Sequence, residues 1–103
     1  MAAFNDSAAL AATTNTTLRT ITAGKAASFS VTLCNRTASA VTVRLAHAAA
    51  TSTPTTAEWI LYDYSLAANA MVQLTGLVAM AGKLVVAYAS AASVAATVYG
   101  FEE

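Results

Sequence analysis

The stretch from Gly82 to Phe101, GKLVVAYASAASVAATVYGF, sets the pattern of the whole chain. Apolar side chains take every second position on both sides of a small-residue turn at Ser90–Ala92: first Leu84, Val86 and Tyr88, then Val94, Ala96 and Val98. A repeat of two places alternate side chains on the same face of a β-sheet. We therefore predict two strands that pair with each other and bury the face that carries these residues.

The same alternation recurs upstream, where further strands are predicted over residues 17–22, 27–35, 40–48, 57–64 and 70–75. The second and third of these carry matched apolar sets: Phe29, Val31 and Leu33, then Val41, Val43 and Leu45. We predict a hairpin with its loop at Asn35–Ser39, in which Leu33 pairs with Val41 and Phe29 with Leu45. About seven short strands separated by turn signals predict an all-β fold, a small antiparallel β-sandwich, with a small barrel as the alternative.

The predicted strand over residues 57–64 is apolar on both sides. Trp59 and Leu61 have one parity, whereas Ile60, Tyr62 and Tyr64 have the other. Such a strand is either covered on both faces or lies at a contact surface. We expect Trp59 to pack in the core and at least one of the tyrosines to contact a partner.

One domain is expected from 103 residues, because the chain is too short to close a second core. Residues 17–103 form this β-sandwich domain. Residues 1–16 differ from the rest and could start a short helix capped by Asn5 or Asp6. Because short isolated helices are marginal in water, we expect a mobile N-terminal arm. Phe4 and Leu10 are the anchors by which this arm would order on a neighbouring molecule.

Charge is scarce and balanced. Five basic and five acidic residues cancel, and only 10% of the chain is charged, against about 25% in an average soluble domain. Without a basic patch we expect no nucleic-acid partner. A neutral surface repels its neighbours weakly, which favours a protein packed among others as a homo-oligomer, although an Ala- and Thr-rich sequence bias explains the composition equally well.

No membrane partner is expected either. Leu84–Phe101 is an uncharged run of 18 residues, close to the length of a membrane-spanning helix. Its serines and its strict alternation count against such a helix. The first residues lack the basic region of a secretion signal, so we expect no export by the usual route.

Few side chains could carry chemistry. Cys34 and His47 are the obvious nucleophile and base, and the predicted hairpin places them on opposite faces and far apart. Glu58 and Asp63 have opposite parity in one strand, so they cannot form a carboxylate pair. One histidine, one cysteine and scattered acids do not make a metal site. We expect no catalytic residue, no metal and no cofactor, and hence no enzyme.

From Cys34 onward the chain resembles a family of small bacteriophage virion proteins. The matching pattern consists of strand and turn motifs: Cys34-Asn35-Arg36, Val41–Ala46, Trp59–Tyr64, Leu66–Asn69, Ala81–Leu84, Ser90-Ala91 and Val98–Glu102. It covers about two-thirds of the chain, and the N-terminal 30 residues match less well. The family's proteins are β-sandwiches encoded among head and tail genes, and no catalytic residue belongs to the pattern.

The resemblance implies a non-enzymatic structural protein located in the virion. We expect a capsid decoration (cement) protein that docks in many copies on the major capsid protein or on other virion proteins. The candidate partner contacts are Phe4, Leu10, Trp59, Tyr62 and Tyr64. Two alternatives stay open: a tail, neck or fibre-attachment component, and a carbohydrate-binding module that stacks sugars on the aromatic side chains of residues 59–64.

Overall fold

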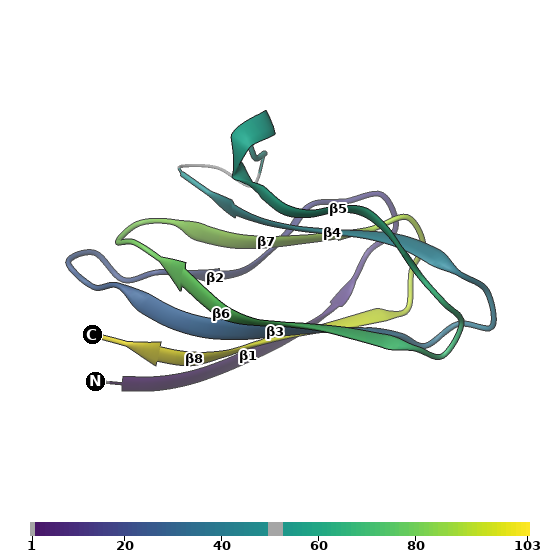
Figure 1. The fold of residues 1–103 in the computed structure, drawn as a ribbon, viewed down its shortest axis with the longest axis horizontal. Coiled ribbons are helices and arrows are strands. Elements are labelled where there is room, and N and C mark those ends of the chain that lie inside the picture. Colours follow the sequence, from purple (N-terminus) through teal and green to yellow (C-terminus); the bar gives the residue numbers. More distant parts are fainter. Residues whose placement is uncertain (1, 50–52) are drawn as a thin grey trace.

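The computed structural model describes residues 2–49 and 53–103, and it consists of two antiparallel sheets of four strands packed face to face (Figure 1). The elements in chain order are β1 (Ala2–Leu10), β2 (Thr16–Thr20), β3 (Ala27–Asn35), β4 (Val41–Ala48), the 3-10 helix η1 (Thr56–Glu58), β5 (Trp59–Leu66), β6 (Met71–Ala79), β7 (Leu84–Ala89) and β8 (Val94–Glu102). The predicted all-β sandwich is confirmed, with eight strands.

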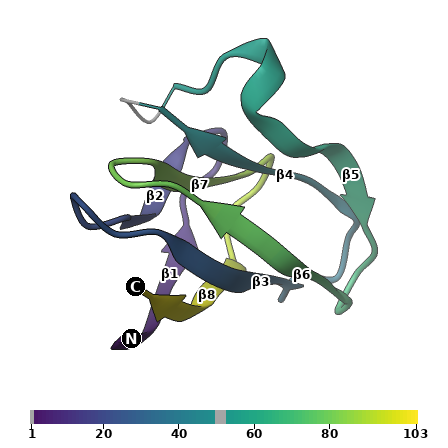
Figure 2. The same ribbon diagram turned by 60° about the vertical axis from the view of Figure 1, so that its left-hand side comes forward.

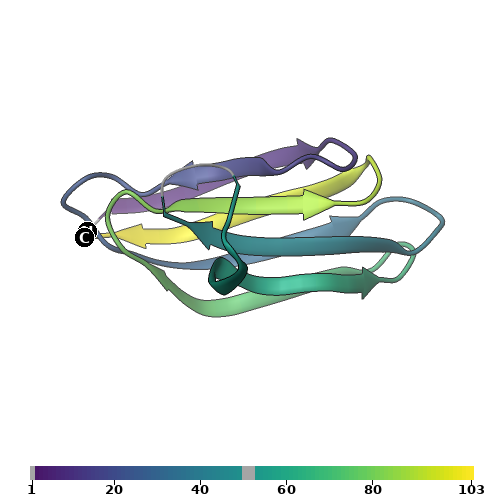
Figure 3. The same ribbon diagram turned by 90° about the horizontal axis from the view of Figure 1, so that it is seen from above.

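The chain passes back and forth between the two sheets. Sheet A has the strand order β1-β8-β3-β6, and sheet B has the order β2-β7-β4-β5 (Figure 2). Among consecutive strands, only β4 and β5 are neighbours within one sheet. Seen from above, the strands of the two sheets run nearly along one direction (Figure 3), as in aligned sandwiches.

The two predicted hairpins are therefore wrong as pairings. The strands β3 and β4 lie in opposite sheets, and so do β7 and β8. Alternation identifies the face that a strand buries, but it does not identify the neighbouring strand. In this sandwich the apolar sets of β3 and β4 meet across the core, and the predicted burial of Phe29, Val31, Leu33, Val41, Val43 and Leu45 is confirmed.

In β7 the prediction of the buried face is wrong, because the residues predicted to face the core lie on the outer face of the sheet. Val85, Ala87 and Ala89 point into the core between the sheets, so Leu84, Val86 and Tyr88 have the outward parity. Val86 is nevertheless fully buried, as is Ala46 beside it in β4. On the outer face of β7, therefore, Val86 is covered, whereas Leu84 and Tyr88 are partly exposed. In β8 the predicted face is correct, since Val94, Ala96 and Val98 are all buried.

The expected N-terminal arm is also wrong, because most of residues 1–16 belong to the sandwich. Residues 2–10 form β1 and pair with β8 in continuous register from Ala2 opposite Glu102 to Leu10 opposite Val94. Phe4 and Leu10 lie in the core with 9% and 2% of their surface exposed. Short polar and alanine-rich segments have little preference of their own, so pairing with the free edge of β8 decides their structure.

Asn35 is a fully buried polar residue that ties two loops to the sandwich. Its side-chain amide donates hydrogen bonds to the carbonyl oxygens of Ser39 (2.8 Å), Leu66 (3.1 Å) and Ala67 (3.1 Å). Its side-chain oxygen accepts from the Thr37 amide (2.9 Å) and hydroxyl (2.7 Å). The residue thereby joins the β3–β4 loop to the turn that follows β5.

We expect Asn35→Asp to destabilise the fold by about 3 kcal/mol, because a buried carboxylate cannot donate to three carbonyl oxygens. Urea unfolding followed by tryptophan fluorescence measures this change. Asn15→Asp is the matched control, since Asn15 lies outside the strands in the loop between β1 and β2, and it should alter the free energy of unfolding by less than about 0.5 kcal/mol. Equal effects of the two substitutions would contradict the bridging role of Asn35.

Candidate interaction surfaces

The outer face of sheet A carries no charged side chain on any of its four strands. We call this surface the sheet A face; its outward residues are Ala3, Asn5, Ser7 and Ala9 of β1, Ala95, Thr97, Tyr99 and Phe101 of β8, Ser28, Ser30, Thr32 and Cys34 of β3, and Met71, Gln73 and Val78 of β6. Small residues and hydroxyls make up its centre. A broad uncharged face of this kind loses little solvation when a partner covers it.

Three large apolar side chains stand exposed on this face. Met71, Val78 and Phe101 expose 59%, 64% and 50% of their surface. Phe101 and Val78 flank Ser28 in one row across three strands. A shallow hollow of about 250 Å³ is lined by Tyr99, Phe101 and Gly76 among others, and the side-chain amide of Gln73 donates to the Tyr99 hydroxyl. The hollow is of a size to receive one side chain of a partner.

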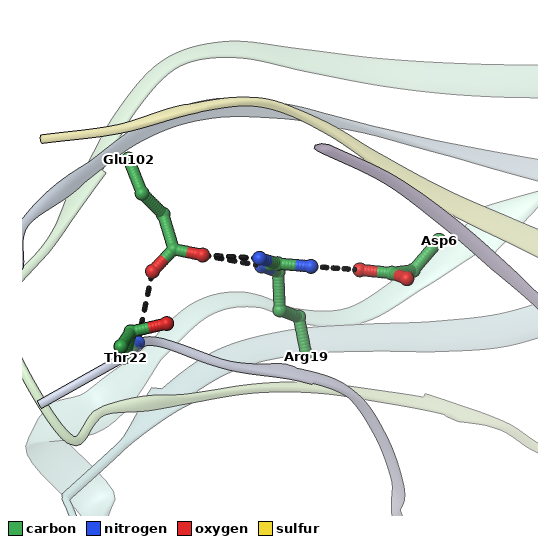
Figure 4. Close-up of polar contacts among 4 residues, drawn as sticks. All are labelled: Asp6, Arg19, Thr22 and Glu102. Carbon is green, nitrogen blue, oxygen red and sulfur yellow. Dashed lines mark hydrogen bonds and ion pairs between the residues drawn. The ribbon is translucent and has the colours of Figure 1, made fainter. Parts of the chain in front are cut away.

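The two acidic residues of sheet A turn inward and meet one arginine of sheet B (Figure 4). Arg19 of β2 donates from Nη1 to Asp6 of β1 (2.7 Å), and from Nε (3.1 Å) and Nη2 to Oε2 of Glu102 in β8. The second carboxylate oxygen of Glu102 accepts from the backbone amide of Thr22 (2.9 Å). The Arg19 guanidinium also lies over the ring of Phe4, 4.0 Å from its centroid.

This Arg19 bridge joins the two sheets beside β1 and β2 and changes the acidity of Glu102. Hydrogen bonds from Arg19 and from the Thr22 amide lower the pKa of Glu102 from its ordinary 4.5 to about 2. The carboxylate is 5% exposed, so it stays ionised in a sheltered position because its oxygens are fully bonded. Both acids have the inward parity of their strands, and the bridge binds them there.

Acid should remove the contribution of Glu102 to stability. Because its pKa is lower in the folded chain, this contribution is complete above pH 4.5 and disappears as the pH falls from 4.5 towards 2. We expect Glu102→Gln to lower the melting temperature at neutral pH and to make its decline below pH 4.5 shallower. Thermal unfolding at a series of pH values measures both effects.

Glu103→Gln provides the comparison, since Glu103 is the exposed neighbour outside the strand. Its acid profile should follow that of the unsubstituted protein. If Glu102→Gln gives the same profile as well, the Arg19 bridge does not contribute to acid sensitivity.

A second cluster lies on the outer face of sheet B, around Arg44 of β4. The Arg44 guanidinium lies 4.3 Å from the ring centre of Tyr62, 4.6 Å from that of Tyr88 and 5.7 Å from that of Trp59. Its Nε donates to Asp63 at 2.5 Å. The hydrogen bond to Asp63 raises the pKa of Arg44. Exposed cation–aromatic contacts each contribute about 0.5–1 kcal/mol, so they stabilise this arrangement of side chains.

The aromatic side chains of β5 are arranged differently from the prediction. Trp59 and Tyr62 were expected on opposite faces, but their rings meet edge to face with centroids 5.3 Å apart. The reason is two irregularities in the pairing of β5 with β4 and a left-handed backbone at Asp63 (φ 48°). Each irregularity inserts one residue and reverses the parity beyond it. Tyr64 consequently pairs with Val43, a residue of the inward face.

The predicted contact residues thus divide into two groups. Phe4 and Leu10 are enclosed by their own chain, so the expectation that they anchor on a neighbour is replaced by a packing role. Tyr62 and Tyr64 expose 56% and 44% of their surface. Trp59 is partly buried against Tyr62 and Arg44 on the outer face of sheet B, so the expectation that it packs in the core is wrong. A hollow of about 330 Å³ is lined by Thr56, Trp59 and Tyr62.

The candidate reactive residues do not form a site. Cys34 lies on sheet A and His47 on sheet B, Glu58 is bound to the amide of Thr55 (2.8 Å), and Asp63 is paired with Arg44. Over residues 2–49 and 53–103, no group of three or more histidine, cysteine or acidic side chains could hold a metal ion. Within the same residues, no helix has the length and apolar character needed to cross a membrane.

Comparison of the chain with protein-family models, with curated proteins and with solved structures found no match in any of the three.

Proposed function

We propose that this protein is a non-enzymatic structural component of a bacteriophage virion, most concretely a capsid decoration protein that docks in many copies on the shell. The observation that carries the proposal is the sheet A face, on which four strands present no charge and three exposed apolar side chains. The sequence resemblance to small virion proteins supplies the setting. Many identical weak contacts then reinforce a lattice through multivalency.

The docking contact would be made by burial of flat, weakly hydrated surface rather than by ion pairs. Phe101, Val78 and Met71 supply the apolar area, and the hollow beside Tyr99 receives a side chain of the major capsid protein. The serine and threonine hydroxyls between them bond to backbone groups of the partner.

The number of copies per particle tests the location of the protein. We expect quantitative mass spectrometry of purified particles to give one copy per shell subunit, or one per three. A ratio of about one in fifty would indicate a tail or neck protein, because the low symmetry of the tail gives those parts few copies per particle. Absence from the particles would contradict a virion role altogether.

A lysine in the centre of the sheet A face should prevent docking. Thr97 lies between Ser7 and Thr32 on neighbouring strands, so Thr97→Lys buries an unpaired ammonium group in the contact. We expect at least a tenfold loss of binding to purified empty shells, which corresponds to about 1.4 kcal/mol. Co-sedimentation with the shells, at equal protein concentrations, measures this loss.

Ser65→Lys is the matched control, because Ser65 is an exposed outward residue of β5 in sheet B. It should leave shell binding within about twofold, less than 0.5 kcal/mol. If Ser65→Lys alone reduces shell binding, the docking surface lies on β5 instead. Unimpaired binding by both variants would contradict docking through either sheet.

A second candidate function is carbohydrate binding, which the hollow beside Trp59 and Tyr62 favours. Aromatic rings of this kind stack on the apolar faces of sugars. If the protein binds glycans, sugars will shift the fluorescence of Trp59, the single tryptophan of the chain, and Tyr62→Ala will abolish the shift. A silent glycan array together with unchanged fluorescence would remove this candidate.

A further inference from the structure

The sandwich has four free sheet edges, and three of them are irregular. Register shifts interrupt the pairing of β2, of β5 and of β6 with their neighbours, and β6 also contains Gly76 with a φ of +72°. Bulges, short length and twist are the usual means by which proteins prevent an edge strand from pairing with another chain. These three edges are therefore protected.

The fourth edge, β1, has no such protection. Its nine residues pair with β8 in unbroken register, so the opposite side of the strand presents a regular row of backbone donors and acceptors. The outward side chains Ala3, Asn5, Ser7 and Ala9 are small, uncharged and exposed. The one charged residue of β1, Asp6, turns inward and is neutralised by Arg19.

We infer that β1 pairs with β1 of a second copy of this chain, joining two sheets A into one continuous sheet of eight strands. We take the partner to be a second copy because its β1 edge is equally regular and uncharged, so the two edges match each other. Pairing of β1 with any other edge of a copy would meet a bulged strand. The antiparallel arrangement has twofold symmetry, which closes the assembly at two chains and prevents fibre growth.

The charge on β1 also selects the register. A twofold axis at Asp6 would place two carboxylates directly opposite each other, which is unfavourable. An axis at Asn5 is also unfavourable, because it would set the charged Asp6 opposite the apolar Phe4 of the partner subunit. With the axis at Ser7, Asp6 lies opposite the partner's Ala8, which is small and uncharged. The backbone of Phe4 then pairs with that of the partner's Leu10, while both side chains stay in their own cores. The dimer therefore has Ser7 opposite the partner's Ser7 and Asn5 opposite the partner's Ala9.

Sedimentation analysis with a charge swap at Ser7 tests the dimer without any shell. The wild-type chain should sediment at twice its 10.5 kDa mass. Ser7→Asp and Ser7→Lys should each be monomeric, because like charges oppose each other at the axis, and an equimolar mixture should regain the dimer mass. A monomeric wild-type protein would overturn the inference. Dimers that persist in both single variants would likewise exclude the β1 edge.

Disulfide formation between single cysteines tests the register, in a background with Cys34→Ser. Asn5→Cys mixed with Ala9→Cys should form a cross-linked dimer under oxidation, since opposing strand residues lie about 5 Å apart. Neither variant alone should cross-link, because its two cysteines are four positions apart along the strand, about 13 Å.

Gln73→Cys, exposed on the opposite edge of the sheet A face, is the control and should form no cross-link. Efficient cross-linking through residue 73, or none in the mixture of the first two variants, would contradict the proposed pairing. Neither result depends on virion docking, so the dimer and the proposed function can fail separately.

Discussion

The bridge from Arg19 to Asp6 and Glu102 is the interaction on which both proposed surfaces depend. It takes the only two acids of sheet A and binds them between the sheets, which leaves the outer face without charge and the β1 edge without repulsion. Sheltered ion pairs add little net stability, because desolvation offsets most of the attraction. Loss of one partner is costly, however, since it leaves the others unpaired. The bridge therefore fixes the position of β1 against β2 and β8 more than it strengthens the fold.

Charge is distributed unevenly between the two sides of the molecule. Ten charged residues are present in the chain, and on the strands of sheet A only Asp6 and Glu102 are charged, both directed inward. Sheet B carries Arg44 and Asp63 on its outer face, paired with each other. The few charged side chains thus lie away from the outer face of sheet A, and the composition alone does not reveal this arrangement.

Much of the fold was predictable because the alternation of apolar residues along a strand indicates which side chains are buried. The bounds of β3 and the buried parity of β3, β4 and β8 follow from the spacing of Phe29, Val31, Val94 and their neighbours. Strand order was not predictable, since residues far apart in the chain, such as Asp6 and Val98, pair without any local signal. The alanine-rich sequence of β1 has no strong preference of its own, and only the free edge of β8 makes it a strand.

The candidate surfaces were predictable only in part. Tyr62 and Tyr64 are exposed as expected for contact residues, but the bulges of β5 that set their directions leave no mark in the spacing. The sheet A face needs the order of four strands before its lack of charge can be seen. Asn35 was missed as well, because a buried asparagine and a loop asparagine look the same in sequence.

The integration of β1 into sheet A is the central claim, and amide hydrogen exchange measured by NMR tests it most directly. If the account is correct, the amides of β1 that bond to β8 exchange as slowly as those of β3, only when the whole domain unfolds. Exchange of every amide between residues 2 and 10 at the rate of an unstructured peptide would show a mobile arm instead. Both the uncharged face and the β1 dimer would then lose their basis.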